Sequence, residues 1–146
     1  MEKRDLIAIA QTKARAYDLE SSLVCAIVEQ ESDWNPWAIR YEPGFYSRYV
    51  LPSLSVGHFG ATEATCRATS WGLMQLMGEV AREYGFGGPF LSELCDPVIG
   101  TDLGCKYLSV LYGKTSNNTK AALLRWNGGS NGAYPDQVMA RMPTYV

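Results

Sequence analysis

The amino-acid sequence predicts an all-α fold that is mainly helical, with room for a small β element between residues 40 and 60. Apolar residues recur at helical spacing along most of the chain; within residues 4–17, for example, Ile7, Ala10 and Ala14 fall on one face. Residues that cap or stop helices flank these stretches, and no convincing alternation of apolar and polar residues indicates a strand.

The second helix is expected to begin at Ser21 or Ser22, whose side chains suit an N-cap, and to run through about Asp33. Its first half, residues 23–28, is apolar on every side, which indicates a helix buried in the core. An Asn-Pro pair at 35–36 then ends the helix, because the residue before a proline disfavours helical backbone.

The rest of the chain alternates between loop signals and further helices. Residues 36–69 contain several glycine and proline turn signals and are expected to be irregular. Helix is expected to resume near Trp71 or Gly72 and to run to about Tyr84. An Asp-Pro pair at 96–97 suits a helix start, with the aspartate as N-cap. The later helices are predicted from Pro97 to about Tyr112, from about Asn118 to Trp126, and from Pro135 or Asp136 onward.

Length and composition favour one domain spanning residues 1–146. The net charge is −2 and no lysine or arginine cluster appears, so we expect no nucleic-acid partner. No apolar run approaches the roughly 20 residues that span a bilayer, so we expect no membrane insertion. The first residues carry no leader pattern, which predicts a chain made without a signal peptide, or a mature domain whose signal was removed. We also expect a monomer.

The cysteines do not have the spacing of a metal site. Cys25, Cys66, Cys95 and Cys105 form no CxxC pair, and His58 is the only histidine. We therefore expect no metal and no cofactor. Free, partly buried thiols are preferred over disulfides.

Glu31 lies near the C-terminal end of the buried second helix. Apolar surroundings and the negative end of the helix dipole both disfavour the charged carboxylate, so the pKa of Glu31 should be raised. A raised pKa suits a general acid at neutral pH. Acidic residues near helix ends are also common on solvated surfaces, so this segment alone favours the plainer interpretation.

Two later segments carry side chains suited to polar ligands such as sugars. Gln75 offers both a donor and an acceptor, and Met77 can line an adaptable apolar groove. Trp126 can stack on a sugar ring or pack beside an acid, and Asn127 can bind a substrate or cap a helix. Taken singly, an amphipathic core helix and a helix cap are the favoured interpretations.

The order of these segments resembles the transglycosylase SLT domain of soluble lytic transglycosylases, a family in the lysozyme superfamily that includes goose-type lysozymes. That family carries a Glu-Ser pair followed by aromatic-Asn-Pro, then Gly-Leu-Met-Gln, then Ala-Tyr-Asn-x-Gly, then a C-terminal Tyr-Val. The corresponding segments here are Glu31-Ser32 with Trp34-Asn35-Pro36, then Gly72–Gln75, Arg125–Gly129 and Tyr145-Val146. The resemblance covers roughly residues 5–146 and implies a lysozyme-like, mainly helical fold.

The resemblance implies that Glu31 is the catalytic acid/base and that Gln75, Met77, Trp126 and Asn127 belong to the substrate cleft. The implied substrate is the glycan strand of bacterial peptidoglycan, cut between N-acetylmuramic acid and N-acetylglucosamine to leave a 1,6-anhydro end. A short wall-degrading chain without an evident leader also resembles a phage endolysin, which implies action at the cell wall or periplasm.

The sequence departs from the family pattern in three places. Trp126 stands where the family has a tyrosine thought to hold the catalytic glutamate, and an indole can only donate a hydrogen bond. Arg40 stands where the family has a serine, if no gap intervenes. The stretch at about 38–69 is longer than in compact members and is expected to be an inserted loop beside the cleft.

A hydrolytic mechanism is the main alternative. An inverting lysozyme or chitinase-like hydrolase needs a second carboxylate roughly 6.5–9.5 Å from the acid to activate water. Glu42 in the inserted loop is the best candidate and Glu63 a weaker one, although a loop carboxylate beside a Pro-Gly turn is the favoured interpretation of Glu42. A non-catalytic glycan-binding module is a further alternative, and an intact Glu31 argues against it.

Overall fold

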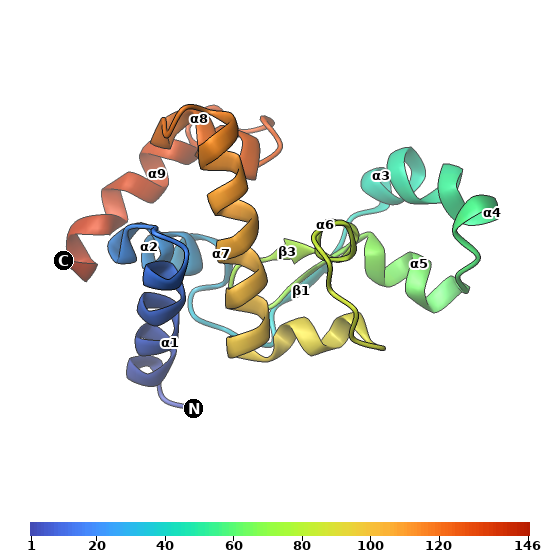
Figure 1. The fold of residues 1–146 in the computed structure, drawn as a ribbon, viewed down its shortest axis with the longest axis horizontal. Coiled ribbons are helices and arrows are strands. Elements are labelled where there is room, and N and C mark those ends of the chain that lie inside the picture. The colour runs from blue at the N-terminus through green and yellow to red at the C-terminus, as the bar shows by residue number, and fades with distance from the viewer.

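The computed structural model describes residues 1–146 as a larger and a smaller group of helices with a small antiparallel sheet between them (Figure 1). The larger group comprises α1 (Lys3–Ala16), α2 (Ser21–Ser32), α7 (Pro97–Lys114), α8 (Thr119–Trp126) and α9 (Tyr134–Arg141). The smaller group comprises α3 (Pro43–Phe45), a π-helical turn (Tyr46–Val50), a 3₁₀ turn (Leu51–Ser53), α4 (Leu54–Gly57) and α5 (Ala61–Arg67). Between them lie β1 (Ile39–Tyr41), β2 (Thr69–Trp71), β3 (Leu76–Met77) and α6 (Gly78–Glu83), and 3₁₀ turns cover Leu91–Cys95 and Met142–Tyr145. The prediction of a mainly helical chain is confirmed.

The core of the larger group forms around α2. Residues 23–28 are all buried, as their uninterrupted apolar character predicted, and Ser22 before them is buried as well. They share one hydrophobic cluster with side chains from the other helices of this group: Leu6 and Ala10 on α1, Leu108 on α7, Leu123 on α8 and Val138 on α9. Because α2 is enclosed by its neighbours, the position of its C-terminal end, and of Glu31 there, is fixed by packing.

Helix starts agree with the sequence where a side chain caps the helix. The Asp96 carboxylate accepts the backbone N–H groups of Val98 and Ile99, so α7 begins as predicted. The start of α2 differs: Glu20 occupies the N-cap position without a capping bond from its side chain, and the Ser22 hydroxyl donates to the Glu20 carboxylate. The predicted serine cap was therefore wrong.

The predicted helix from Trp71 to Tyr84 was wrong in its first half. Residues 69–77 form a strand, a turn and a strand, and helix begins only at Gly78. Gly72 and Gln75 have φ values of 69° and 51°, and left-handed backbone of this kind does not continue an α-helix. The apolar run resembled a helix because the turn itself sends its central side chains into the core.

The segment 36–69, predicted to be irregular, is largely helical. Its short helices enclose a cluster of Val50, Ala64 and Ala68. The expected β element is confined to β1 at the edge of the 40–60 window, and it pairs with β2 in the register Ile39↔Trp71 to Tyr41↔Thr69. β1 has only three residues, so its alternation of apolar and polar residues is too brief to predict a strand.

The cysteines are free thiols, and three of the four are buried. Burial raises the pKa of Cys25 to about 11 and that of Cys105 to about 12. These thiols therefore stay protonated at neutral pH and act as small apolar core residues.

Candidate active site

Glu31 is a half-buried carboxyl group held by two aromatic donors. It lies one residue before the end of α2. Its Oε1 accepts a hydrogen bond from the Tyr134 hydroxyl at 2.5 Å and another from Trp126 Nε1 at 3.2 Å. Both bonds use the same oxygen, which leaves Oε2 without a protein donor. Oε2 is therefore the oxygen that can carry a proton and meet a ligand.

The surroundings of Glu31 favour its protonated form. Burial raises its pKa above the usual value, and this effect outweighs the hydrogen bonds from Tyr134 and Trp126 and the charge of Arg40, all of which lower it. The predicted direction of the shift is confirmed, with burial as its main cause. A carboxyl group with a raised pKa is better suited to general acid catalysis than an ordinary glutamate.

A groove of about 490 Å³ runs past Glu31. One wall comes from β1 and α3, and another from α8 and the loop that follows it. With the exception of Glu63, the groove brings together the residues that the sequence assigned to a site, although they come from separate parts of the chain: Glu31, Glu42, Gln75, Met77, Trp126 and Asn127. Their roles remain predictions, but their common location makes one joint function chemically feasible.

The turn between β2 and β3 is joined directly to the end of α2. Ser32, next to Glu31, donates from its hydroxyl to the backbone oxygen of Leu73 at 2.8 Å. On its other side, the turn packs against the 3₁₀ turn Leu91–Cys95. A Cβ atom on Gly72 would lie 2.5 Å from the backbone oxygen of Leu94, so the close approach of these two turns requires glycine. The Glu-Ser and Gly-Leu-Met-Gln motifs thus form one structural unit.

Gln75 supports this unit as well as lining the groove. Its Nε2 donates to the backbone oxygens of Ala38 at 2.9 Å and Gly72 at 3.0 Å, which ties the approach to β1 to the turn. Its amide nitrogen is therefore engaged, and only Oε1 is left for a ligand.

We expect Gln75→Ala to lower stability as well as activity. Losing two hydrogen bonds at about 1 kcal/mol each should lower the melting temperature by about 4–8 °C in a domain of this size. The melting temperature is measured by circular dichroism. Gln11→Ala on α1, where the residue contributes backbone bonds to the helix, is the control and should melt within about 2 °C of the wild type. An unchanged melting temperature in Gln75→Ala would contradict a role of Gln75 in stability and leave only its role in the groove.

Asn127 caps its helix, and its second predicted role, substrate binding, stays a prediction. It is the C-cap residue of α8, and it also lines the groove. Its Nδ2 donates a long hydrogen bond of 3.4 Å to the backbone oxygen of Asn131, which steadies the loop after α8.

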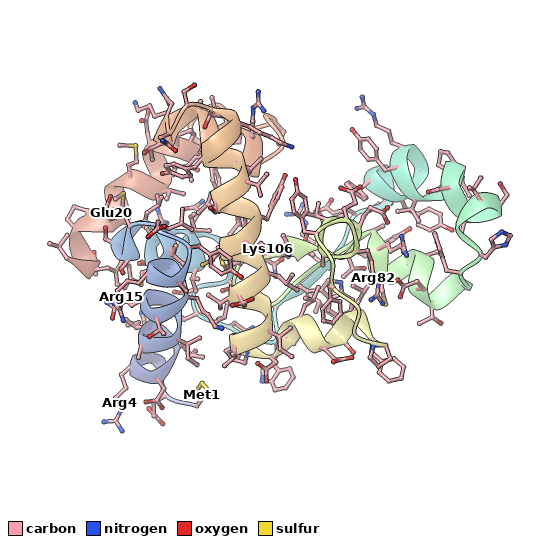
Figure 2. The ribbon with its side chains drawn as sticks, viewed as in Figure 1. Met1, Arg4, Arg15, Glu20, Arg82 and Lys106 are labelled. Atoms are coloured by element: carbon pink, nitrogen blue, oxygen red, sulfur yellow. The ribbon has the colours of Figure 1, made fainter.

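The two candidate second carboxylates differ in location. Glu42 lines the groove, but its Oε1 is paired with Nε of Arg40 at 2.9 Å. Glu63 is not among the groove residues. It accepts from Nε of Arg82 at 2.7 Å and from Nε of Arg67 at 3.1 Å, and these bonds hold its pKa below the usual value. Arg82 lies where α6 meets α5 (Figure 2), so Glu63 joins two helices and has no place in the groove.

Tyr134 was missed by the sequence reasoning, although it makes the shorter bond to Glu31. The last helix was expected from Pro135 or Asp136, but it begins at Tyr134, which is buried. Burial and the adjacent carboxylate raise the pKa of the Tyr134 hydroxyl, so it remains a donor at all ordinary pH values. The tyrosine directly before the helix-starting proline was the one signal available. Trp126, the departure from the family pattern, keeps its contact because donating is all that this contact requires.

Comparison with known proteins identifies the family of this chain. The family model of the transglycosylase SLT domain matches residues 8–135. The chain belongs to this family. The resemblance inferred from the four ordered motifs is confirmed, and the SLT match includes Glu31, Gln75, Trp126 and Tyr134.

Curated relatives of this SLT domain are considerably longer proteins. Membrane-bound lytic murein transglycosylase C of Yersinia pestis (strain Pestoides F) is 28% identical over 137 residues, covering 85% of this chain and 31% of the relative. The same protein from Yersinia pseudotuberculosis (serotype O:1b, strain IP 31758) gives the same values. The chain thus spans about a third of the length of these relatives. No solved structure matches it, and no helix in this SLT domain has the length and apolar character needed to cross a bilayer.

Proposed function

We propose that this SLT domain acts at the bacterial cell wall as a lytic transglycosylase, cutting the β-1,4 bond between N-acetylmuramic acid and N-acetylglucosamine in peptidoglycan. The observation that carries the proposal is the setting of Glu31: a carboxyl group that lines a groove, accepts two hydrogen bonds on Oε1, has Oε2 free, and has a pKa raised by burial. Family membership and the names of the curated relatives support the same reaction.

In the first step, Glu31 protonates the glycosidic oxygen from Oε2. The bond between that oxygen and C1 of the muramic acid breaks, and N-acetylglucosamine leaves with the proton on its new hydroxyl. Glu31 becomes a carboxylate as positive charge develops at C1. The hydrogen bonds from Tyr134 and Trp126 to Oε1 stabilise this carboxylate, since charged acceptors bind donors more strongly than neutral ones.

In the second step, the same carboxylate acts as the base. It takes the proton from the C6 hydroxyl of the muramic acid, and O6 bonds to C1 to close the 1,6-anhydro ring. Glu31 is protonated again and no water is consumed. One carboxylate suffices because the nucleophile belongs to the substrate, and such intramolecular attack reaches effective molarities of about 10⁵ M or more.

An inverting hydrolase is the second candidate, and the presence of Glu42 in the same groove favours it. Glu42 would then have to accept a proton from a water molecule while paired with Arg40. The unpaired Oε2 of Glu31 and the lack of any need for a second carboxylate make the transglycosylase route the better supported one.

The mass of the products decides between the two mechanisms. We expect purified peptidoglycan digested by the domain to yield muropeptides with anhydromuramic acid ends, which weigh one water less than hydrolysed ones. A digest with Glu31→Gln provides the blank. Reducing muramic acid ends would instead show hydrolysis and overturn the transglycosylase mechanism.

A further inference from the structure

A side pocket of about 500 Å³ opens off the groove between α7 and α8. Tyr107, Arg125 and Gly128 line both the side pocket and the groove. The two hollows therefore share lining residues and lie next to each other.

The side pocket is positively charged in a chain of net charge −2. Lys114 and Arg125 are its only charged lining residues, and both are exposed. Neither takes part in any ion pair of the chain. Two cations without carboxylate partners at one pocket are complementary to an anionic ligand.

The other walls of the side pocket are apolar and aromatic. Tyr107, Leu111 and Lys114 follow one another at helical spacing along one face of α7, and Leu124 faces them from α8. The ring of Tyr84 lies 5.0 Å from that of Tyr107. A pocket with an aliphatic and aromatic surface beside two cations suits a short peptide bearing carboxylates better than a small inorganic anion.

The side pocket is also close to the reacting bond. Arg125 directly precedes Trp126, which donates to Glu31. The ring of Tyr107 lies 5.5 Å from that of Trp126. In peptidoglycan, the peptide stem is attached to the lactyl group of the same muramic acid whose C1 would react at Glu31. A stem-binding site must therefore adjoin the part of the groove that contains Glu31, as this pocket does.

We infer that the side pocket binds the anionic peptide stem of the muramic acid residue being cut, with the Arg125 guanidinium and the Lys114 ammonium group holding stem carboxylates. The inference rests on the proposed function, because it requires that muramic acid occupy the groove beside Glu31. It makes the domain selective for glycan strands that carry charged stems.

The test compares two substrates that differ only in stem charge. Soluble, uncrosslinked glycan strands are used with native stems, or after their stem carboxylates have been converted to amides with excess ammonia. The readout is the ratio of kcat/KM on native strands to that on amidated strands. We expect a ratio of about ten or more for the wild type, as expected for a charge-assisted hydrogen bond, and a ratio near one for the double variant Arg125→Gln/Lys114→Gln. Arg125→Lys, which keeps the charge, should retain most of the preference.

The matched control is Arg4→Gln/Arg15→Gln, which removes the same charge from α1 (Figure 2). This variant should keep the wild-type ratio. A ratio near one in the wild type, or an undiminished ratio in the Arg125→Gln/Lys114→Gln variant, would overturn the inference while leaving the proposed function intact. An equal loss in the control would assign the preference to overall charge and would also overturn it. If the wild type cuts neither substrate, the proposed function itself fails.

Discussion

Glu31→Gln is expected to fold like the wild type and to cut peptidoglycan at least about a hundredfold more slowly, because removing a general acid costs on that order. Glutamine has nearly the same shape, and its Oε1 can still accept the bonds from Tyr134 and Trp126. Its amide group in the place of Oε2 can neither protonate the leaving oxygen nor take a proton from the C6 hydroxyl. The measurement is the initial rate of muropeptide release. Activity above about a tenth of wild type would contradict the assignment of Glu31.

The same substitution should raise the melting temperature at neutral pH. Burial raises the pKa of Glu31 in the folded chain above that of an unfolded glutamate. Between these two pKa values the folded chain binds more protons than the unfolded chain, so its stability falls as pH rises. This loss of stability is complete above the pKa of Glu31 in the folded chain and absent below its pKa in the unfolded chain. Glutamine does not ionise, so the variant loses no stability in this way. Its melting temperature should therefore exceed that of the wild type increasingly as pH rises, and the difference should vanish in acid.

Glu42→Gln is the control because it makes the same chemical change in the same groove. With the transglycosylase mechanism, most activity should remain, since Glu42 transfers no proton. A loss comparable to that of Glu31→Gln would instead identify Glu42 as the base of an inverting hydrolase, which needs its base as much as its acid.

Local signals were sufficient for the helices of the larger group. An aspartate before a proline capped α7, and the apolar residues 23–28 predicted the buried α2. The turn at Gly72 was different, because its shape depends on the backbone of Leu94, which no local pattern reveals. The helices of residues 43–67 are short and interrupted by turns, so their periodicity was too brief to recognise.

The part of the candidate site that lies in or next to the ordered motifs was predicted from the sequence. Glu31, Gln75, Met77, Trp126 and Asn127 were found from motifs, and all line one groove. Tyr134 was not found, because it contacts Glu31 across 103 residues of sequence and lies outside every motif considered. The unpaired cations of the side pocket are likewise visible only once α7 and α8 are packed together.

Tyr134→Phe is expected to slow cleavage by about tenfold to a hundredfold, less than the roughly 10²–10³-fold cost of removing one oxyanion-hole donor, because Trp126 still donates to the same oxygen. The hydroxyl of Tyr134 holds Oε1 and stabilises the carboxylate that forms when Glu31 gives up its proton. Its hydrogen bond also lowers the pKa of Glu31, so removing it should raise that pKa further. Activity requires protonated Glu31 and is lost as pH rises through its pKa. The alkaline limb of the kcat/KM profile should therefore move to higher pH in the variant.

Tyr145→Phe separates this electrostatic effect from a general loss of packing. Tyr145 also donates its hydroxyl to a carboxylate on α2, that of Glu29, but it does not line the groove. Its substitution should lower the melting temperature without moving the pH profile. If Tyr134→Phe likewise lowers stability and leaves the alkaline limb in place, Tyr134 only packs against α2. If the limb moves in Tyr134→Phe alone, the hydroxyl sets the protonation of Glu31, which is the property that both steps of the proposed reaction use.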